Sequence, residues 1–171
     1  EGTLETTYSF IPYTSQNDSR RATYPVVYSR EGREFEYTYD SDSFPTQKTY
    51  SDDTTEQWSY EPTFKQLARY KDRENRVTKY TYDTAGNRLT KEVGILYNPA
   101  TQQDVNQPEH AVYSWQYYGD SETVEGVLQP EGLLKAEIDP LGNTVRYVYN
   151  ADNLLWKVYE PDDAGTGEHV A

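Results

Sequence analysis

Aromatic side chains recur along the chain in pairs that are separated by a single residue. The six pairs are Tyr8/Phe10, Tyr37/Tyr39, Trp58/Tyr60, Tyr80/Tyr82, Trp115/Tyr117 and Tyr147/Tyr149. Residues two apart in a β-strand point to the same face of the sheet. The pattern therefore predicts short strands whose aromatic side chains line one face, with polar residues such as Lys79 and Thr81 on the other.

Turn signals precede three of these pairs at a fixed distance. The segments are Ser29–Gly32, Asp72–Asn75 and Asp139–Gly142. Asp or Ser at the first position of a type I turn caps it with the side chain, and Gly or Asn at the fourth tolerates the left-handed conformation that follows. We therefore predict a tight turn directly before each of these strands.

A second set of turns follows the aromatic pairs. Asp83–Gly86 and Asn150–Asn153 carry the same residue types, and Leu89 and Leu155 then begin the returning strand. The resulting unit is turn, strand, turn, strand. The predicted fold class is all-β, built from antiparallel β-hairpin repeats that form an extended, twisted or coiled sheet.

The repeats define the expected domain organisation. Residues 1–159 form a single array of about six irregular hairpin units, whose first aromatic positions Tyr37, Trp58 and Tyr80 are 21 and 22 residues apart. Insertions interrupt the array near residues 12–28, 97–110 and 119–132, and we expect 97–110 to be a long surface loop. We expect residues 160–171 to be a mobile tail or linker.

The composition raises the alternative of disorder. Leu, Ile, Val and Phe make up less than about 20% of the chain, a level typical of unfolded charged sequences. The 18 Tyr and 3 Trp argue against disorder, because each ring can bury a large area while its polar tip stays hydrated. The expected core is therefore aromatic.

Charge and missing residue types exclude several function classes. With 29 Asp and Glu against 16 Lys and Arg, the net charge is −13, which opposes binding to nucleic acids and to anionic membranes. The chain lacks Cys, so disulfide scaffolds and Cys-ligated zinc sites are excluded. No apolar run approaches the length of a membrane span. The chain also lacks Met, and we expect a fragment or a processed chain.

The stretches "DRENRVTKYTYDTAGNRLTKEV" and "DPLGNTVRYVYNADNLLWKV" resemble the YD-repeat, or Rhs, family. The family pattern is roughly D-x-x-G-N-x-x-x-Y-x-Y-D-x-x-G-R-L. The chain departs from it at Asn75, Asn150 and Asn153. The residues assigned to the motif are Asp72, Asn75, Tyr80, Tyr82, Asp83, Gly86, Leu89, Asp139, Gly142, Tyr147, Tyr149, Asn150, Asn153 and Leu155, with a weaker match at Gly32, Tyr37, Tyr39 and Asp40.

The resemblance implies a structural role. Family members use such repeats to build a β-sheet that coils into a hollow shell, which encloses a toxic polypeptide in Rhs and insecticidal toxin-complex proteins. In teneurins a related barrel supports cell-surface recognition. The expected partners are other repeats of the same or neighbouring chains, an encapsulated polypeptide, or cell-surface glycans, and the expected location is extracellular or at the cell surface.

Other functions have weaker support in the sequence. The two histidines, His110 and His169, lie in expected loop and tail segments, so we predict no catalytic residues, cofactor or metal site. Surface Ca²⁺ binding at residues 40–42 or 161–163 is a weak alternative, because no EF-hand spacing supports it. Trp58, Trp115 and Trp156 are candidates for glycan stacking, which would make the chain an adhesin module. A third alternative is assembly into fibres through exposed sheet edges.

Overall fold

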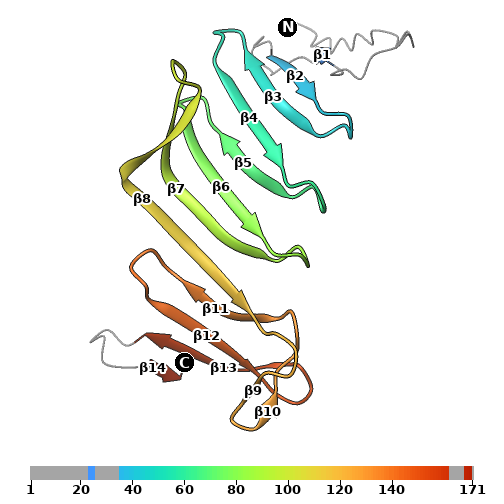
Figure 1. Cartoon of the computed structure of the whole chain (residues 1–171), viewed down its shortest axis with the longest axis vertical. Helices are drawn as coiled ribbons and strands as arrows, with labels where there is room; N and C mark the ends of the chain where they lie inside the picture. The colour runs from blue at the N-terminus through green and yellow to red at the C-terminus, as the bar shows by residue number, and fades with distance from the viewer. Residues whose placement is uncertain (1–22, 26–34, 162–167, 171) are drawn as a thin grey trace, which may run out of the picture. The chain divides into compact units, whose positions relative to one another are not determined.

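The computed structural model describes residues 23–25, 35–161 and 168–170 (Figure 1). The regular structure in these ranges is all β-strand, which confirms the predicted fold class. Twelve strands are hydrogen-bonded in the order β1-β2-β3-β4-β5-β6-β7-β8-β11-β12-β13-β14, and β9 and β10 form a separate two-stranded sheet. The strand order follows the chain order because nearly every strand pairs with its sequence neighbour.

The chain divides into two compact units. The first contains residues 1–77 and 96–105, and the second contains residues 78–95 and 106–171. The first unit holds β1 (Thr23–Pro25), β2 (Phe35–Tyr39), β3 (Pro45–Tyr50), β4 (Thr55–Tyr60) and β5 (Leu67–Lys71). The strands β6 (Arg76–Tyr82), β7 (Arg88–Asn98) and β8 (Gln103–Tyr117) contribute residues to both units. The second unit also holds β9 (Thr123–Val124), β10 (Val127–Leu128), β11 (Leu134–Ile138), β12 (Thr144–Tyr149), β13 (Leu155–Pro161) and β14 (Glu168–Val170).

The strand register in the first unit separates an aromatic face from a polar face. Tyr37 lies opposite Lys48, Lys48 opposite Glu56, and Trp58 opposite Tyr70. Residues directly opposite each other in an antiparallel pair share a face. The alternate residues form the other face, where Gln47 Oε1 accepts a hydrogen bond of 3.0 Å from Gln57 Nε2.

The second unit has a small buried centre. Tyr118, Ala136 and Val148 are its buried core residues around β11 and β12, and the polar side chain of Gln129 is buried beside them. Tyr118 packs edge-on against Tyr149, with ring centroids 6.2 Å apart. The insertion 119–132 supplies Gln129 and forms the β9–β10 hairpin, so it packs as ordered structure rather than as a free loop.

Two segments that the sequence predicts to be irregular contain strands. Residues 97–110, expected as a surface loop, belong mostly to β7 and β8 of 11 and 15 residues, joined by a short turn after Asn98. The insertion therefore lengthens a hairpin. In the expected tail, Glu160 and Pro161 end β13, and residues 168–170 form β14, which pairs with Tyr159–Pro161. Residues 12–28 lie outside the described residues except for β1.

Candidate functional site

Six turns share one backbone geometry. They begin at Asp40, Tyr50, Asp72, Asp83, Asp139 and Asn150. In each, the N–H of the fourth residue donates to the C=O of the first at 3.0–3.1 Å, and the N–H of the first donates to the C=O of the fifth at 2.9–3.0 Å. The fourth residue has a φ between +62° and +88° in all six. This is a type I turn followed by a left-handed residue, which matches the twist of antiparallel strands.

A side-chain oxygen of the first residue holds most of these turns closed. Asp83 Oδ1 accepts the N–H groups of Ala85 and Asn87 at 2.9 and 2.8 Å, and Asp83 Oδ2 accepts Asn87 Nδ2 at 3.0 Å. Asn150 Oδ1 does the same with the N–H groups of Asp152 and Leu154, both at 3.0 Å. Asn150 stands where the repeat pattern has aspartate. Its side-chain oxygen makes the same two backbone contacts as the Asp83 carboxylate.

The turn hydrogen bonds stabilise the charged form of Asp83 and Asp139. The Asn143 side chain, together with backbone N–H groups of the turn, lowers the pKa of Asp139. Burial alone would raise the pKa of Asp83, but the hydrogen bonds from Asn87 and the turn backbone outweigh burial and lower it. A carboxylate that accepts several N–H groups is favoured over its protonated form.

Ion pairs join neighbouring turns along each edge of the first unit. Because strands alternate in direction, turns that are neighbours along one edge are every second turn in the sequence. At one edge Lys65 Nζ lies 2.6 Å from Asp42 Oδ2. At the other edge Arg73 Nη2 lies 2.5 Å from Asp52 Oδ2, and Arg73 Nε donates to Thr54 Oγ1 at 2.8 Å. The turns therefore contact one another as well as the strands they connect.

Aromatic rings form a ladder across the first unit. The Tyr37 and Trp58 ring centroids are 6.5 Å apart and those of Trp58 and Tyr70 are 5.9 Å apart, both at 30° between ring planes. Tyr39 extends the row, 6.0 Å from Tyr37. Tyr37 belongs to one aromatic pair of the sequence pattern and Trp58 to the next, so these two successive pairs contact each other through their first residues.

A carboxylate and an ammonium lie among these rings. Glu56 accepts hydrogen bonds from the hydroxyl groups of Tyr50 and Tyr70, each at 2.7 Å. Burial and the adjacent Glu56 carboxylate raise the pKa of Tyr70. Lys48 Nζ lies 4.2 Å from the Phe35 ring centroid. The aromatic face is therefore bound together by charge–ring and hydroxyl–carboxylate contacts as well as by apolar area.

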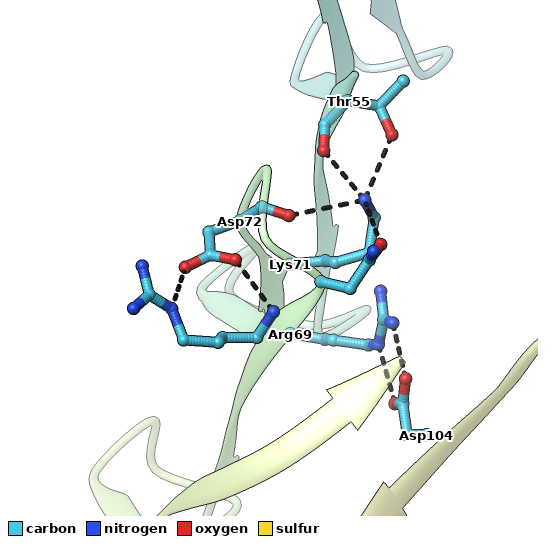
Figure 2. A network of polar contacts seen from close by, with 7 residues as sticks. Thr55, Arg69, Lys71, Asp72 and Asp104 are labelled. Carbon is cyan, nitrogen blue, oxygen red and sulfur yellow. Dashed lines mark hydrogen bonds and ion pairs between the residues drawn. The ribbon is translucent and has the colours of Figure 1, made fainter. Parts of the chain in front are cut away.

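A polar network occupies the opposite face of the first unit (Figure 2). The Lys71 side chain, with only 3% of its residue surface exposed, donates from Nζ to Thr55 O at 2.8 Å and Thr55 Oγ1 at 3.1 Å. Burial and the nearby Arg69 lower the pKa of Lys71. Arg69 makes two hydrogen bonds to Asp104, from Nε at 2.8 Å and from Nη2 at 2.6 Å. These contacts tie β5 to β4 and to the start of β8.

In the second unit, a glutamate links two of the predicted aromatic positions. Glu137 Oε1 accepts Trp115 Nε1 at 3.1 Å, and Glu137 Oε2 accepts the Tyr147 hydroxyl at 3.2 Å. The Tyr149 hydroxyl donates to Leu134 O at 3.0 Å. Each aromatic side chain thus reaches across to a neighbouring strand.

The three tryptophans considered for glycan stacking all have neighbours against their rings. Trp58 lies between Tyr37 and Tyr70. The Arg88 guanidinium carbon lies 3.9 Å from the Trp115 ring centroid, and Lys157 Nζ lies 4.2 Å from that of Trp156. Trp156 is 49% exposed, which leaves it the most accessible of the three.

The remaining motif residues have varied positions. Tyr80 and Tyr82 are half-buried in β6, Leu89 lies near the start of β7, and Leu155 begins β13 with an exposed side chain. Gly32 lies outside the described residues. The sequence gives no signal for Gln129, Lys71 or Lys48, whose partners lie on other strands.

Within residues 35–161, the His, Asp and Glu side chains that could act as catalytic groups or metal ligands do not gather at one place. His110 Nε2 lies 3.2 Å from Glu92 Oε2 on adjacent strands. The described residues contain no group of three or more His, Asp or Glu side chains suited to hold a metal ion. None of them belongs to a helix long and apolar enough to cross a bilayer.

The chain is similar to known proteins at the level of three-dimensional structure. No family model and no curated protein matches the chain. Among solved structures, the chain is similar to the crystal structure of TcdB2-TccC3-TEV, with a TM-score of 0.41 and 14% sequence identity. The similarity covers 80% of this chain and 8% of that chain, so this chain spans less than a tenth of that protein's length.

Proposed function

We propose that the chain is a structural repeat module of a secreted or cell-surface protein of the YD/Rhs type, which builds part of a β-sheet shell or stalk. The observation that carries the proposal is the recurrence of one turn geometry, with its capping side chain, at Asp40, Asp72, Asp83, Asp139 and Asn150. In this proposal the assembled sheet encloses or presents a polypeptide such as a toxin.

The use of the basic side chains supports a structural role. Nine of the Lys and Arg side chains in residues 35–161 lie over aromatic rings: Lys48, Arg69, Lys71, Arg73, Arg88, Lys91, Lys135, Arg146 and Lys157. A cation within about 6 Å of a ring centroid is attracted by the ring quadrupole. These contacts pair charge with aromatic area, as expected of side chains that hold strands together.

The glycan-binding alternative differs from this proposal in what the tryptophans do. A sugar needs a free ring face, whereas Trp58 and Trp115 have ring or guanidinium neighbours. We expect Trp58→Ala and Trp115→Ala to lower the melting temperature, and the more exposed Trp156→Ala to change it little. The parent chain should show no saturable binding on a glycan array.

The test combines thermal unfolding of the three variants with glycan-array binding of the parent and of Trp156→Ala. Saturable binding that Trp156→Ala abolishes at an unchanged melting temperature would overturn the structural assignment in favour of an adhesin. Negative-stain images of the complete protein then test the shell, since an open filament would contradict it. Size-exclusion chromatography of the chain at several concentrations separates a monomeric module from a fibre-forming one.

A further inference from the structure

Three aromatic rings surround the ammonium group of Lys48. Its Nζ lies 4.2 Å from the ring centroid of Phe35, 4.5 Å from that of Tyr50 and 5.7 Å from that of Tyr37. The strand register explains the arrangement, because Phe35 lies opposite Tyr50 and Tyr37 opposite Lys48 across β2 and β3. Phe35 and Tyr37 also meet edge to face, with ring centroids 5.6 Å apart.

Acidic and basic neighbours border these rings. Glu56 lies opposite Lys48 on β4 and accepts the Tyr50 hydroxyl at 2.7 Å. The Arg73 guanidinium carbon lies 4.1 Å from the Tyr50 ring centroid. Burial lowers the pKa of Lys48, but the hydrogen bond with Tyr50 and the neighbouring Glu56 outweigh it, and the pKa is raised overall. The surroundings thus favour a positive charge at this point.

We propose that Phe35, Tyr37 and Tyr50 form a binding site for methylated ammonium ions, which the chain's own Lys48 fills. Ring faces attract cations through their quadrupole, and sets of rings around one point are the arrangement that recognises quaternary ammonium groups. A methylated ammonium is less strongly hydrated than the Lys48 ammonium and has apolar methyl groups to place against the rings. Two sources of this chemistry fit the site. One is a free ligand that displaces Lys48, and the other is Lys48 itself after a separate enzyme transfers methyl groups to Nζ from a sulfonium donor, which leaves as a thioether while Nζ loses a proton for each methyl group gained.

This site is independent of the shell proposal. It depends on three rings and one lysine in β2 and β3, and a structural module could carry it or lack it. Loss of binding would therefore leave the proposed structural function untouched, and failure of the shell proposal would leave this site to be judged on its own.

The first test uses Lys48→Ala, which empties the site, and tetramethylammonium chloride as the probe. We expect tetramethylammonium to raise the melting temperature of Lys48→Ala by about 2–4 °C above the effect of equimolar sodium chloride, with a smaller effect on the parent. Lys91→Ala is the matched control, because Lys91 lies near one ring only, 5.8 Å from Tyr113. Equal shifts for the two salts in Lys48→Ala would overturn the proposal for a free ligand.

The second test addresses methylation of Lys48 and makes its measurement on the parent chain, with one conservative variant for assignment. Reductive methylation of the parent chain with ¹³C-formaldehyde gives dimethyl-lysine signals, and Lys48→Arg identifies the signal of Lys48. A methyl group held against ring faces should resonate upfield of the dimethyl signals of Lys65 and Lys91. Tetramethylammonium should move that signal back toward theirs. A Lys48 signal that coincides with theirs would overturn the site itself.

Discussion

Gln129 takes the place of a neighbouring strand beside Tyr149. Its Oε1 accepts the Tyr149 N–H at 2.9 Å, and its Nε2 donates to the Tyr149 C=O at 3.2 Å. The register pairs of β11 with β12 stop at Arg146, and the pairing of β12 with β13 is irregular between Val148 and Tyr149. A side chain from the 119–132 insertion thus completes the backbone hydrogen bonding of β12.

Removing this side chain should destabilise the second unit. We expect Gln129→Leu to lower the free energy of unfolding by about 1–3 kcal/mol, because both Tyr149 backbone groups lose their partner at a site where Gln129 is only 2% exposed. Urea unfolding followed by tryptophan fluorescence measures the change. Gln116→Ala, at an exposed position of β8, is the control. Equal midpoints for the two variants would show that Gln129 only fills space.

The two-point contact between Arg69 and Asp104 should contribute more than a surface ion pair. The Asp104 and Arg69 side chains are 14% and 22% exposed, against 50% for Asp42 in its pair with Lys65. Asp104→Asn should lower the free energy of unfolding by about 1.5–3 kcal/mol. The substitution makes the acceptor of the two Arg69 hydrogen bonds neutral at a place where solvent screens the charges poorly. Asp42→Asn should leave the denaturation midpoint within error. A large effect of Asp42→Asn and none of Asp104→Asn would reverse this ranking.

The fourth residue of each turn has a left-handed backbone conformation, so the stability of the protein should depend on which side chain stands there. Gly86 has a φ of +88°, which β-branched residues resist, so Gly86→Val should cost at least about 1–2 kcal/mol. Asn153 has a φ of +62° in the equivalent position, and Asn153→Gly should be neutral or stabilising. Thermal unfolding of the two variants provides the comparison. A Gly86→Val protein that melts with the parent would remove Gly86 from this role.

The capped turns should make stability depend on acid pH. Asp83 and Asp139 have pKa values lowered from 3.8, so their contribution is fully present above that pH and is lost as the pH falls through the folded-state values. We expect the parent to lose stability below about pH 4. The double variant Asp83→Asn/Asp139→Asn should lose less over the same interval. Parallel curves of unfolding free energy between pH 2 and 6 would contradict a role for these two carboxylates.

The turns are predictable from the sequence because their chemistry is local. Asp83 and Gly86 lie within one turn, and the capping oxygen and the left-handed residue are fixed by their own spacing. The hairpin of β7 and β8 is different. Its polar residues around Asp104 and Pro108 resemble a loop, because this part of β8 exposes most side chains and lacks the alternation of a half-buried strand.

The contacts between strands are harder to predict from one sequence. The pairing of aromatic positions anticipates Tyr37 beside Trp58, but the sequence does not indicate that Tyr70 continues the row. Lys48, Lys71 and Gln129 are unremarkable polar residues until the strand register brings their partners beside them. Their roles depend on long-range pairing, which residue type and spacing do not encode.

The spacing of the turns limits how such a chain can gain or lose length. The closing hydrogen bonds begin at residues 40, 50, 61, 72 and 83, so successive turns are 10 or 11 residues apart. Loss of a single strand with its turn would reverse the direction of every later strand. Loss or duplication of two strands, about 22 residues, would preserve the direction of every later strand and the face of the sheet to which its side chains point. Evolution of this architecture should therefore proceed in whole hairpins, and engineered versions should be cut at every second turn.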